Sequence, residues 1–414
     1  MTSGAVVARS LVTTRGSAPR RGLDMADLLV VPDAGIAWDE RGILTYVGPS
    51  HGLSDPTNAR EVRGALVPGF VDAHTHVPFF GWRADEFEAR VGGQSYRDLH
   101  GLGGGIARSA RLLAAASDED VLSFGLSLAA EMAAQGTTAT ELKTGYGLSL
   151  EAELRQARLA RRLSEAMPQT ATVTLLACHA VPEGKTRRDW VDQVCAELIP
   201  TAVEEGLVDA VDIYVEDIAF SVEDFERVAD VARRHDLFVR CHADQLGASA
   251  AAEAAVGAGA RNADHLNHLS AEGVAALGAG DTVAGLLPVA DLFTREPAPP
   301  VAELRDAGAA LMMATDFNPG TCPCLSMPEV MAWGASLYGL QPSASLTAMT
   351  LNPAWVLGLH DQLGSLEVGK RADFLVLDTN DLAMIPYRPG HNPVAETWVN
   401  GRQVASGSDP GVSA

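Results

Sequence analysis

The stretch Leu66-Val-Pro-Gly-Phe-Val-Asp-Ala-His-Thr-His76 runs from an apolar, strand-like segment directly into a pair of histidines. Residues two apart in a β-strand share a face, so His74 and His76 point to the same side. Two imidazoles that converge at the end of a strand provide half of a metal site. Such a pair is often coincidental when it stands alone, so the rest of the chain decides its meaning.

Three further apolar runs also lead into residues that can bind a metal. Residues 173–178 (VTLLAC) precede His179, residues 237–241 (LFVRC) precede His242, and residues 311–315 (LMMAT) precede Asp316. Imidazoles and a carboxylate gathered at strand ends suit Zn²⁺ or a similar divalent ion. Such an ion lowers the pKa of a bound water from about 16 to about 7. The pattern therefore predicts a metal-dependent hydrolase.

The order of the strand-like and helical patterns predicts the fold. Repeated strand–helix pairs indicate an eight-stranded parallel barrel, which keeps its active site at the carboxyl ends of its strands. Both ends of the chain are rich in short strands, so we expect them to pair with each other. The predicted class is α/β, a distorted eight-stranded βα (TIM-like) barrel over residues 66–355, with a small β-sandwich from residues 1–65 and 356–414. The strand-like runs of the barrel end at Val71, Thr140, His179, Val215, Cys241 and Thr315, and helical spacing is clearest over residues 118–135 and 150–166.

The composition limits the partners that the protein can have. The 414 residues include 31 basic and 53 acidic ones, which gives a net charge of −22. Such a charge repels nucleic acid and anionic lipid, and no apolar run approaches the length of a membrane span. A secretory signal and a disulfide framework are not expected either. These features predict a cytoplasmic enzyme with a small-molecule substrate, and an anionic substrate would need a local arginine.

Several residues near these strand ends allow more than one interpretation. Arg83 is either a carboxylate clamp or a surface arginine, and Tyr146 is either a site residue or an ordinary half-buried tyrosine. Lys143 is interpreted as a salt-bridged lysine rather than as a carbamylated bridge between two metals. His265 is a candidate general base, whereas His268 is expected at the surface or at a helix cap.

The cysteines are expected to lie outside the chemistry. Cys322 and Cys324 provide only two thiolates, too few for a structural zinc site. Cys178 and Cys241 each precede a site histidine and should therefore point away from it, into the core.

Longer motifs give the chain a specific resemblance. The paired histidines, the later single histidines and the late aspartate are similar to the amidohydrolase superfamily, as are Leu351-Asn-Pro-Ala354 and Gly364-Ser-Leu-Glu-Val-Gly-Lys-Arg-Ala-Asp373. Within that superfamily the chain resembles the imidazolonepropionase family from about residue 25 to the C-terminal region. The strings that carry this resemblance are Arg83-Ala-Asp-Glu-Phe87, Gly103-Gly-Gly-Ile106, Glu141-Leu-Lys-Thr-Gly-Tyr-Gly-Leu148, His179-Ala-Val-Pro182, Cys241-His-Ala-Asp-Gln245 and Thr315-Asp-Phe-Asn-Pro-Gly-Thr321.

The resemblance implies a reaction and a set of site residues. The reaction would be hydrolysis of 4-imidazolone-5-propanoate to N-formimidoyl-L-glutamate in histidine degradation, with one divalent ion, zinc or iron, in a homodimer. Arg83 would hold the propanoate, Asp316 or His265 would move the proton, and His179 would polarise the carbonyl or bind the ring. The implied metal ligands are His74, His76, His242 and Asp316, and the implied substrate contacts are Arg83, Tyr146, His179, Gln245, Asn318, Gly320 and Thr321.

Three departures and two rival functions accompany this resemblance. The stretch after Gly105 (IARSARLLAAAS) lacks a Thr-Arg pair that many members of the family have. Gln245 cannot act as a base, and Asn262-Ala-Asp-His-Leu-Asn-His268 replaces a serine-led string that is more usual in the family. A deaminase of a nucleobase-like ring would share the metal site, but Arg83 would then have no carboxylate to hold. A non-catalytic barrel would be expected to lose metal ligands, and all four are present.

Overall fold

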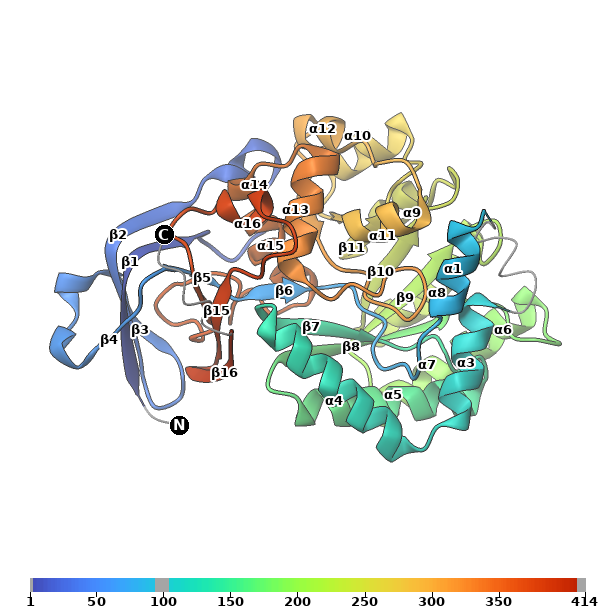
Figure 1. Ribbon diagram of the computed structural model, residues 1–414. Coiled ribbons are helices and arrows are strands. Elements are labelled where there is room, and N and C mark those ends of the chain that lie inside the picture. The colour runs from blue at the N-terminus through green and yellow to red at the C-terminus, as the bar shows by residue number, and fades with distance from the viewer. Residues whose placement is uncertain (1–2, 94–103, 408–414) are drawn as a thin grey trace.

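Eight parallel strands form a barrel in the computed structural model, which describes residues 3–93 and 104–407 (Figure 1). Neighbours in this sheet are also neighbours along the chain, as in a simple series of strand–helix units. Gly103 of the Gly-Gly-Gly-Ile motif lies outside the described residues. The barrel strands are β6 (Phe70–Asp72), β7 (Thr137–Lys143), β8 (Thr170–Cys178), β9 (Ala210–Val215), β10 (Phe238–Ala243), β11 (Asn262–His265), β12 (Val283–Leu286) and β13 (Leu311–Met313).

The barrel closes only loosely where its first and last strands meet. β6 and β13 share no ladder, and a single bridge pairs Thr75 with Phe317 just beyond their ends. Two backbone bonds support it, from the His76 amide to the Phe317 carbonyl at 2.9 Å and from the Asp316 amide to the His74 carbonyl at 3.0 Å. The predicted distorted barrel is therefore confirmed, and its seam passes through the predicted metal ligands.

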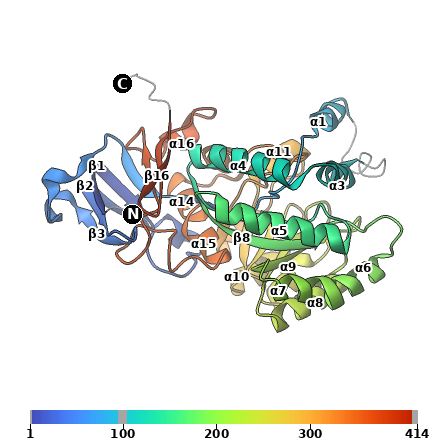
Figure 2. The ribbon, with the colours of Figure 1, turned by 90° about the horizontal axis from the view of Figure 1, so that it is seen from below.

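Helices surround the barrel sheet on its outer side (Figures 1 and 2). Hydroxyl caps begin several of them, and Ser221 and Asp224 form a capping box at the start of α8 that satisfies two otherwise free backbone amides. The helices around the barrel are α1 (Ala84–Val91), α3 (Gly105–Ala115), α4 (Asp118–Ala134), α5 (Leu150–Ala166), α6 (Arg187–Gln193), α7 (Ile199–Glu204), α8 (Val222–Arg234), α9 (Ala251–Gly257), α10 (Ala271–Ala279), α11 (Pro288–Thr294), α12 (Val301–Asp306) and α13 (Met327–Tyr338); α14 (Pro342–Ala348), α15 (Leu351–Val356) and α16 (Met384–Tyr387) follow.

The two ends of the chain form a second, mixed sheet beside the barrel (Figure 2). β5 joins the two ends, because it pairs with β1 on one side and with β14 on the other. Trp38, Phe374 and Trp398 pack together against this sheet and fix its own small core. Its strands are β1 (Gly4–Thr13), β2 (Leu29–Trp38), β3 (Leu44–Pro49), β4 (Arg60–Glu61), β5 (Ala65–Pro68), β14 (Phe374–Leu377), β15 (Val394–Val399) and β16 (Arg402–Ser406).

Asn352, from the Leu-Asn-Pro-Ala motif, fastens the N-terminal segment to the barrel. Its side-chain oxygen accepts from the Arg20 amide at 2.8 Å, and its side-chain nitrogen donates to the carbonyls of Arg20 and Leu311. The next residue, Arg21, donates to the carbonyls of Gly308, Gly280 and Gly278. The Leu-Asn-Pro-Ala motif, which the sequence indicates only as a likeness to the superfamily, thus has a structural role. It helps to hold residues 20–21 against the barrel.

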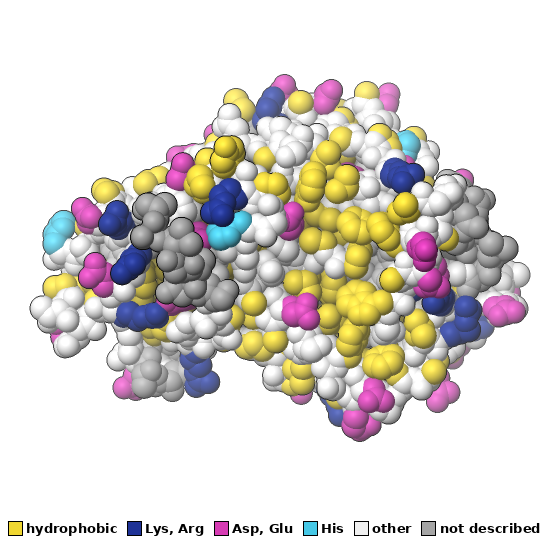
Figure 3. All heavy atoms as spheres, viewed as in Figure 1, with side chains coloured by type: hydrophobic (Ala, Val, Ile, Leu, Met, Phe, Trp, Pro, Cys, Tyr) yellow, Lys and Arg dark blue, Asp and Glu magenta, His cyan; other side chains and the backbone are white. Residues whose placement is uncertain are grey.

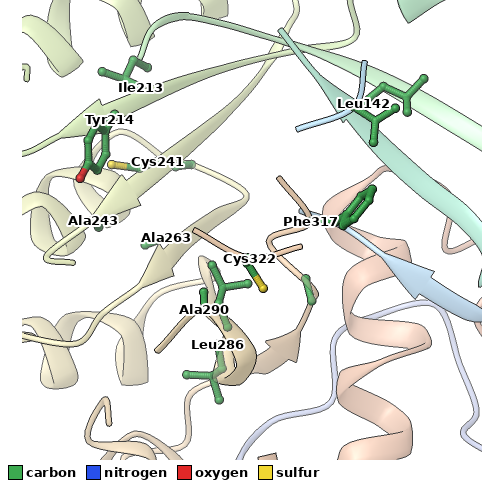
Figure 4. Close-up of a cluster of buried hydrophobic side chains, with 14 of the residues drawn as sticks. Leu142, Ile213, Tyr214, Cys241, Ala243, Ala263, Leu286, Ala290, Phe317 and Cys322 are labelled. Carbon is green, nitrogen blue, oxygen red and sulfur yellow. The ribbon is translucent and has the colours of Figure 1, made fainter. Parts of the chain in front are cut away.

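The largest hydrophobic core lies between the barrel strands and the helices that cover them. Figure 4 shows part of it, with Cys241 of β10 among apolar side chains such as Ile213 and Ala263 from the neighbouring strands. Cys178 and Cys322 are buried in the same core. Burial raises the pKa of all three thiols well above the usual range, because it disfavours the thiolate. The prediction that Cys178 and Cys241 are core thiols is confirmed.

None of the helices over residues 3–93 and 104–407 has the length and apolar character needed to cross a membrane.

Candidate active site

Three buried histidines come together at the carboxyl end of the barrel. His74 and His76 directly follow β6, and His242 lies near the end of β10, so that the ligand atoms they offer all lie within 4.8 Å of one another. Asp316 follows β13, and its Oδ1 lies 3.2 Å from Nε2 of His76 and 3.5 Å from Nε2 of His74. The residues predicted from the strand ends therefore form one cluster across the seam of the barrel.

The chemistry of this cluster suits a divalent cation. Burial lowers the pKa values of His74 and His76 well below their usual range, because the charged imidazolium loses its hydration. Both rings are therefore neutral near pH 7, the form that binds metals. Nε2 of His74, Nε2 of His242 and Nδ1 of His76 are buried and have no hydrogen-bond partner within the described part of the chain. Buried polar atoms are rarely left unpaired unless a ligand uses them.

Two carboxylates beneath the cluster fix the rings of two of these histidines. Oδ2 of Asp264 on β11 lies 2.7 Å from Nδ1 of His74, and Oδ2 of Asp212 on β9 lies 3.0 Å from Nδ1 of His242. A carboxylate at Nδ1 directs Nε2 toward the metal position. Gly285 on β12 pairs with Asp264 and leaves space for it, because a Cβ at residue 285 would lie 1.9 Å from its Oδ1.

Lys143 belongs to a layer of buried charges below the cluster. Its Nζ lies 2.6 Å from Oδ2 of Asp212 and 2.7 Å from Oε2 of Glu141, and Arg240 contacts Glu141 from the other side. The lysine is thus fully engaged in ion pairs, as the interpretation of a salt-bridged lysine predicts. The pKa of Asp212 is well below the usual range, because its interactions with His242 and Lys143 outweigh the effect of burial.

Replacing Asp212 by asparagine is expected to weaken the binding of a divalent ion by about 10- to 100-fold, because His242 loses the carboxylate that orients it. Competition with a chelating dye measures the affinity directly. Asp230→Asn is a suitable control, since Asp230 pairs with Arg233 at the surface. An affinity unchanged in Asp212→Asn would contradict the orienting role.

A pocket opens above the cluster and brings most of the predicted substrate residues together. Its wall includes Ile106 of α3, Leu246 after β10 and Thr294 at the end of α11. Gly320 does not line the pocket itself but lies directly behind Arg83. The predicted site residues that line it are His76, Arg83, Tyr146, His179, His242, Gln245, His265, Asp316, Asn318 and Thr321.

Arg83 places a buried guanidinium in this wall. Its side chain is 3% exposed, and its Nε and Nη1 have no hydrogen-bond partner among the described residues. Oε2 of Glu86 lies 3.6 Å from Nη1, close enough to balance part of the charge. Gly320 is needed beside it, because a Cβ there would lie 1.8 Å from Nη2 of Arg83. The interpretation of Arg83 as a surface arginine is therefore wrong, because α1 and the loop after Asp316 enclose its side chain.

Asn318 organises the loop that carries Gly320 and Thr321. Its side-chain oxygen accepts from the amides of Gly320, Thr321 and Cys322, and its side-chain nitrogen donates to the Asp316 carbonyl. The side chain therefore shapes the loop, and it holds Asp316 in the backbone conformation with φ of 54°. This use is more specific than the substrate contact implied by the resemblance alone.

His179 and Tyr146 lie together beside His76 of the metal cluster. The His179 ring stacks on that of His76 at a centroid distance of 5.2 Å, and Tyr146 lies 5.5 Å from His179. Nδ1 of His179 contacts the Gly145 carbonyl at 3.2 Å, which leaves Nε2 for another partner. Gln245 and His265 complete the ring around the pocket.

Sequence reasoning missed several residues of the site. Tyr214 lines the pocket and packs on His242 at 5.7 Å. Asp212 and Asp264 support the histidines, yet neither stands at a strand end followed by a loop. A carboxylate inside an otherwise apolar strand, such as Asp212 in Ala-Val-Asp-Ile-Tyr-Val, is the signal that could have identified the first of them.

Comparison with known proteins agrees with this geometry. Residues 65–404 match the model of the amidohydrolase family. Over 95% of its length, the chain is 39% identical to the imidazolonepropionase of Deinococcus radiodurans, 98% of which is covered. The chain belongs to the imidazolonepropionase family. A second member, from Aeromonas hydrophila, is 41% identical over 93% of this chain and 95% of its own.

The family makes the protein a metal-dependent hydrolase. Among solved structures, a zinc-bound adenosine deaminase from Xanthomonas campestris has a TM-score of 0.68 over 97% of this chain and 92% of its own. It is only 20% identical to this member of the imidazolonepropionase family, so it shows the same fold and nothing about the substrate.

Proposed function

We propose that the protein hydrolyses the ring amide of 4-imidazolone-5-propanoate to give N-formimidoyl-L-glutamate, a step of histidine degradation. The observation that carries this proposal is the pairing of two features in one pocket. A buried cluster of three histidines and Asp316 lies at its base. The guanidinium of Arg83 lies in its wall, and its Nε and Nη1 have no hydrogen-bond partner among the described residues. The substrate combines a ring amide for the first feature with a carboxylate for the second.

His74, His76, His242 and Asp316 would hold one divalent ion. When bound, this ion supplies Lewis-acid activation of a water molecule and polarises the ring carbonyl. Arg83 holds the propanoate through charge-assisted hydrogen bonds from Nε and Nη1. Tyr146 and Gln245 enclose the ring, and Thr321 borders it near Arg83.

The proton moves through residues of this chain. Oδ1 of Asp316 accepts a proton from the attacking water as the new bond forms at the carbonyl carbon. The same carboxyl gives this proton to the ring nitrogen as the carbon–nitrogen bond breaks, so one water is consumed. His265 has a pKa of about 3 because of its burial, so it remains neutral and orients the ring or relays the proton.

His179 contributes to the attack of water on the ring carbonyl. With its Nδ1 against the Gly145 carbonyl, Nε2 is left to bind the ring or to polarise the carbonyl oxygen. Burial lowers the pKa of His179 well below its usual range, so it acts as a neutral hydrogen-bonding group.

Loss of the ultraviolet absorbance of freshly prepared 4-imidazolone-5-propanoate tests the function. We expect a loss that depends on bound metal and that stops after treatment with a chelator. A protein that retains its metal but leaves the absorbance unchanged would refute the substrate while leaving the hydrolase class intact. A panel of aminated heterocycles, scored for ammonia release, would then test the deaminase alternative.

We further propose that the ion is zinc or iron, that the enzyme is cytoplasmic, and that it forms a homodimer. Histidine and carboxylate ligands accept either metal. Support for an interface comes from the face seen in Figure 3, where hydrophobic side chains gather. Large exposed apolar side chains occur on several helices around the barrel, namely Phe87 on α1, Leu126 on α4, Leu292 on α11 and Leu337 on α13.

A further inference from the structure

The end of β11 and the turn that follows it hold two consecutive non-glycine residues in a left-handed backbone conformation. His265 has φ of 79° and Leu266 has φ of 64°. Side chains with a Cβ rarely adopt these angles, so the surroundings must hold them there. The angle at His265 directs its ring into the pocket, where it lies 5.3 Å from that of His242. A turn that relaxed to ordinary angles would carry this ring away.

Backbone hydrogen bonds tie the turn to β10. The Leu266 amide donates to the Ala243 carbonyl at 3.0 Å, and the His268 amide donates to the Asp244 carbonyl at 2.8 Å. These bonds fix the turn on one side only, next to the strand that carries His242. The other side faces the helices that follow β12.

Asn267 provides the connection on that other side. Its side-chain nitrogen donates to Oδ1 of Asp291 at 2.7 Å and to the Pro297 carbonyl at 2.8 Å. Asn267 and Asp291 are each 5% exposed, so water does not compete for these bonds. The hydroxyl of Tyr338, at the end of α13, donates to Oδ2 of Asp291. Asp291 lies on α11, three residues before Thr294 of the pocket wall.

We propose that Asn267, held by Asp291 and Tyr338, is a positioning residue that keeps His265 directed into the pocket. The inference rests on the function proposed above, because it gives His265 a part in the reaction. Asn267 does not line the pocket and acts through the backbone of the turn. The buried side-chain nitrogen of Asn267 and the buried carboxylate of Asp291 pair with each other, in a contact that the reaction itself does not use.

A double-mutant cycle tests this inference. We would measure kcat and KM for His265→Ala, Asn267→Ala and the double variant, with thermal unfolding to show that each is folded. Asn267→Ala is expected to lower kcat by up to about 100-fold, the effect of a catalytic group displaced by about 1 Å, with KM little changed. Once His265 is absent, the second substitution is expected to change nothing further.

A neighbouring residue provides the matched control. His268→Ala is expected to retain the kcat of the unmodified enzyme, because its side chain pairs with Glu296 near the surface. Tyr338→Phe offers a milder second test, since it leaves Asn267 in place and removes only the hydroxyl that holds Asp291. It should lower kcat less than Asn267→Ala does, and again only while His265 is present.

The possible failures are distinguishable. If His265→Ala retains full kcat, both the role of His265 in the proposed function and this inference are wrong. If His265→Ala loses activity but Asn267→Ala does not, only the inference is wrong. Independent effects, in which the double variant loses the product of the two single losses, would likewise overturn it and give Asn267 a merely structural role.

Discussion

His242→Ala is expected to lower kcat/KM for 4-imidazolone-5-propanoate by about 10⁴-fold, which corresponds to about 5.4 kcal/mol at 1.36 kcal/mol per tenfold change. The reason is that His242 projects from β10 and offers the metal position a buried Nε2 that has no hydrogen-bond partner among the described residues. Without it, a bound ion would keep only the ligands of β6 and Asp316, and activation of water would be lost. Metal content after gel filtration should fall in parallel.

His268→Ala serves again as the control for His242→Ala. Each variant removes one imidazole, but only that of His242 belongs to the metal cluster. Circular dichroism and thermal unfolding would show that both variants are folded. A His242→Ala enzyme that keeps one metal per chain and a kcat/KM within tenfold of the original would refute the assigned ligand.

Arg83→Met is expected to lower kcat/KM by about 10²- to 10³-fold, mainly through KM. Methionine retains much of the volume that packs against Gly320. It removes the one guanidinium or ammonium group that the described residues of the pocket wall offer a carboxylate. Loss of a buried charge-assisted pair costs about 3 to 4 kcal/mol, which gives a change of this size. Steady-state kinetics on the same substrate measures it.

An analogue without the propanoate separates the effect of charge from that of packing. On such a ring amide, Arg83→Met and the unmodified enzyme should be equally slow, because there is no carboxylate to hold. Arg227→Met is the control for a general loss of positive charge, since Arg227 pairs with Asp192 at the surface. Equal losses on both substrates would mean that Arg83 supports the fold rather than the carboxylate.

The sequence predicted the parts of the site that stand at the ends of apolar runs. His74, His76, His242 and Asp316 were found in this way, because a strand that ends in a loop carries its last side chains to one end of the barrel. The residues at which other strands end were harder to predict from the sequence. β7 was expected to end at Thr140 but continues to Lys143. Charged residues such as Glu141 and Lys143 are typical of loops, so the sequence indicated that the strand had already ended. In the barrel, these two side chains form an ion pair.

Two barrel strands had no recognisable pattern at all. β11 and β12 contain four residues each, and β11 reads Asn-Ala-Asp-His, which is too short and too polar for a periodicity argument. Their place in the barrel follows from the tertiary pairing of Asp264 with Gly285. The support of His74 by Asp264 could not be predicted for the same reason, since it joins residues 190 apart in the chain.

The pairing of β5 on both sides has a consequence for synthesis of the chain. Leu66 pairs with Leu11 early, but its other partner, Val376, follows roughly 300 residues later, which takes about 15 to 60 s at about 5 to 20 residues per second. During this time one edge of β5 has unsatisfied amides and carbonyls, and open edges of this kind invite pairing with other chains. The nascent protein therefore passes through a long interval in which aggregation competes with completion of the terminal sheet.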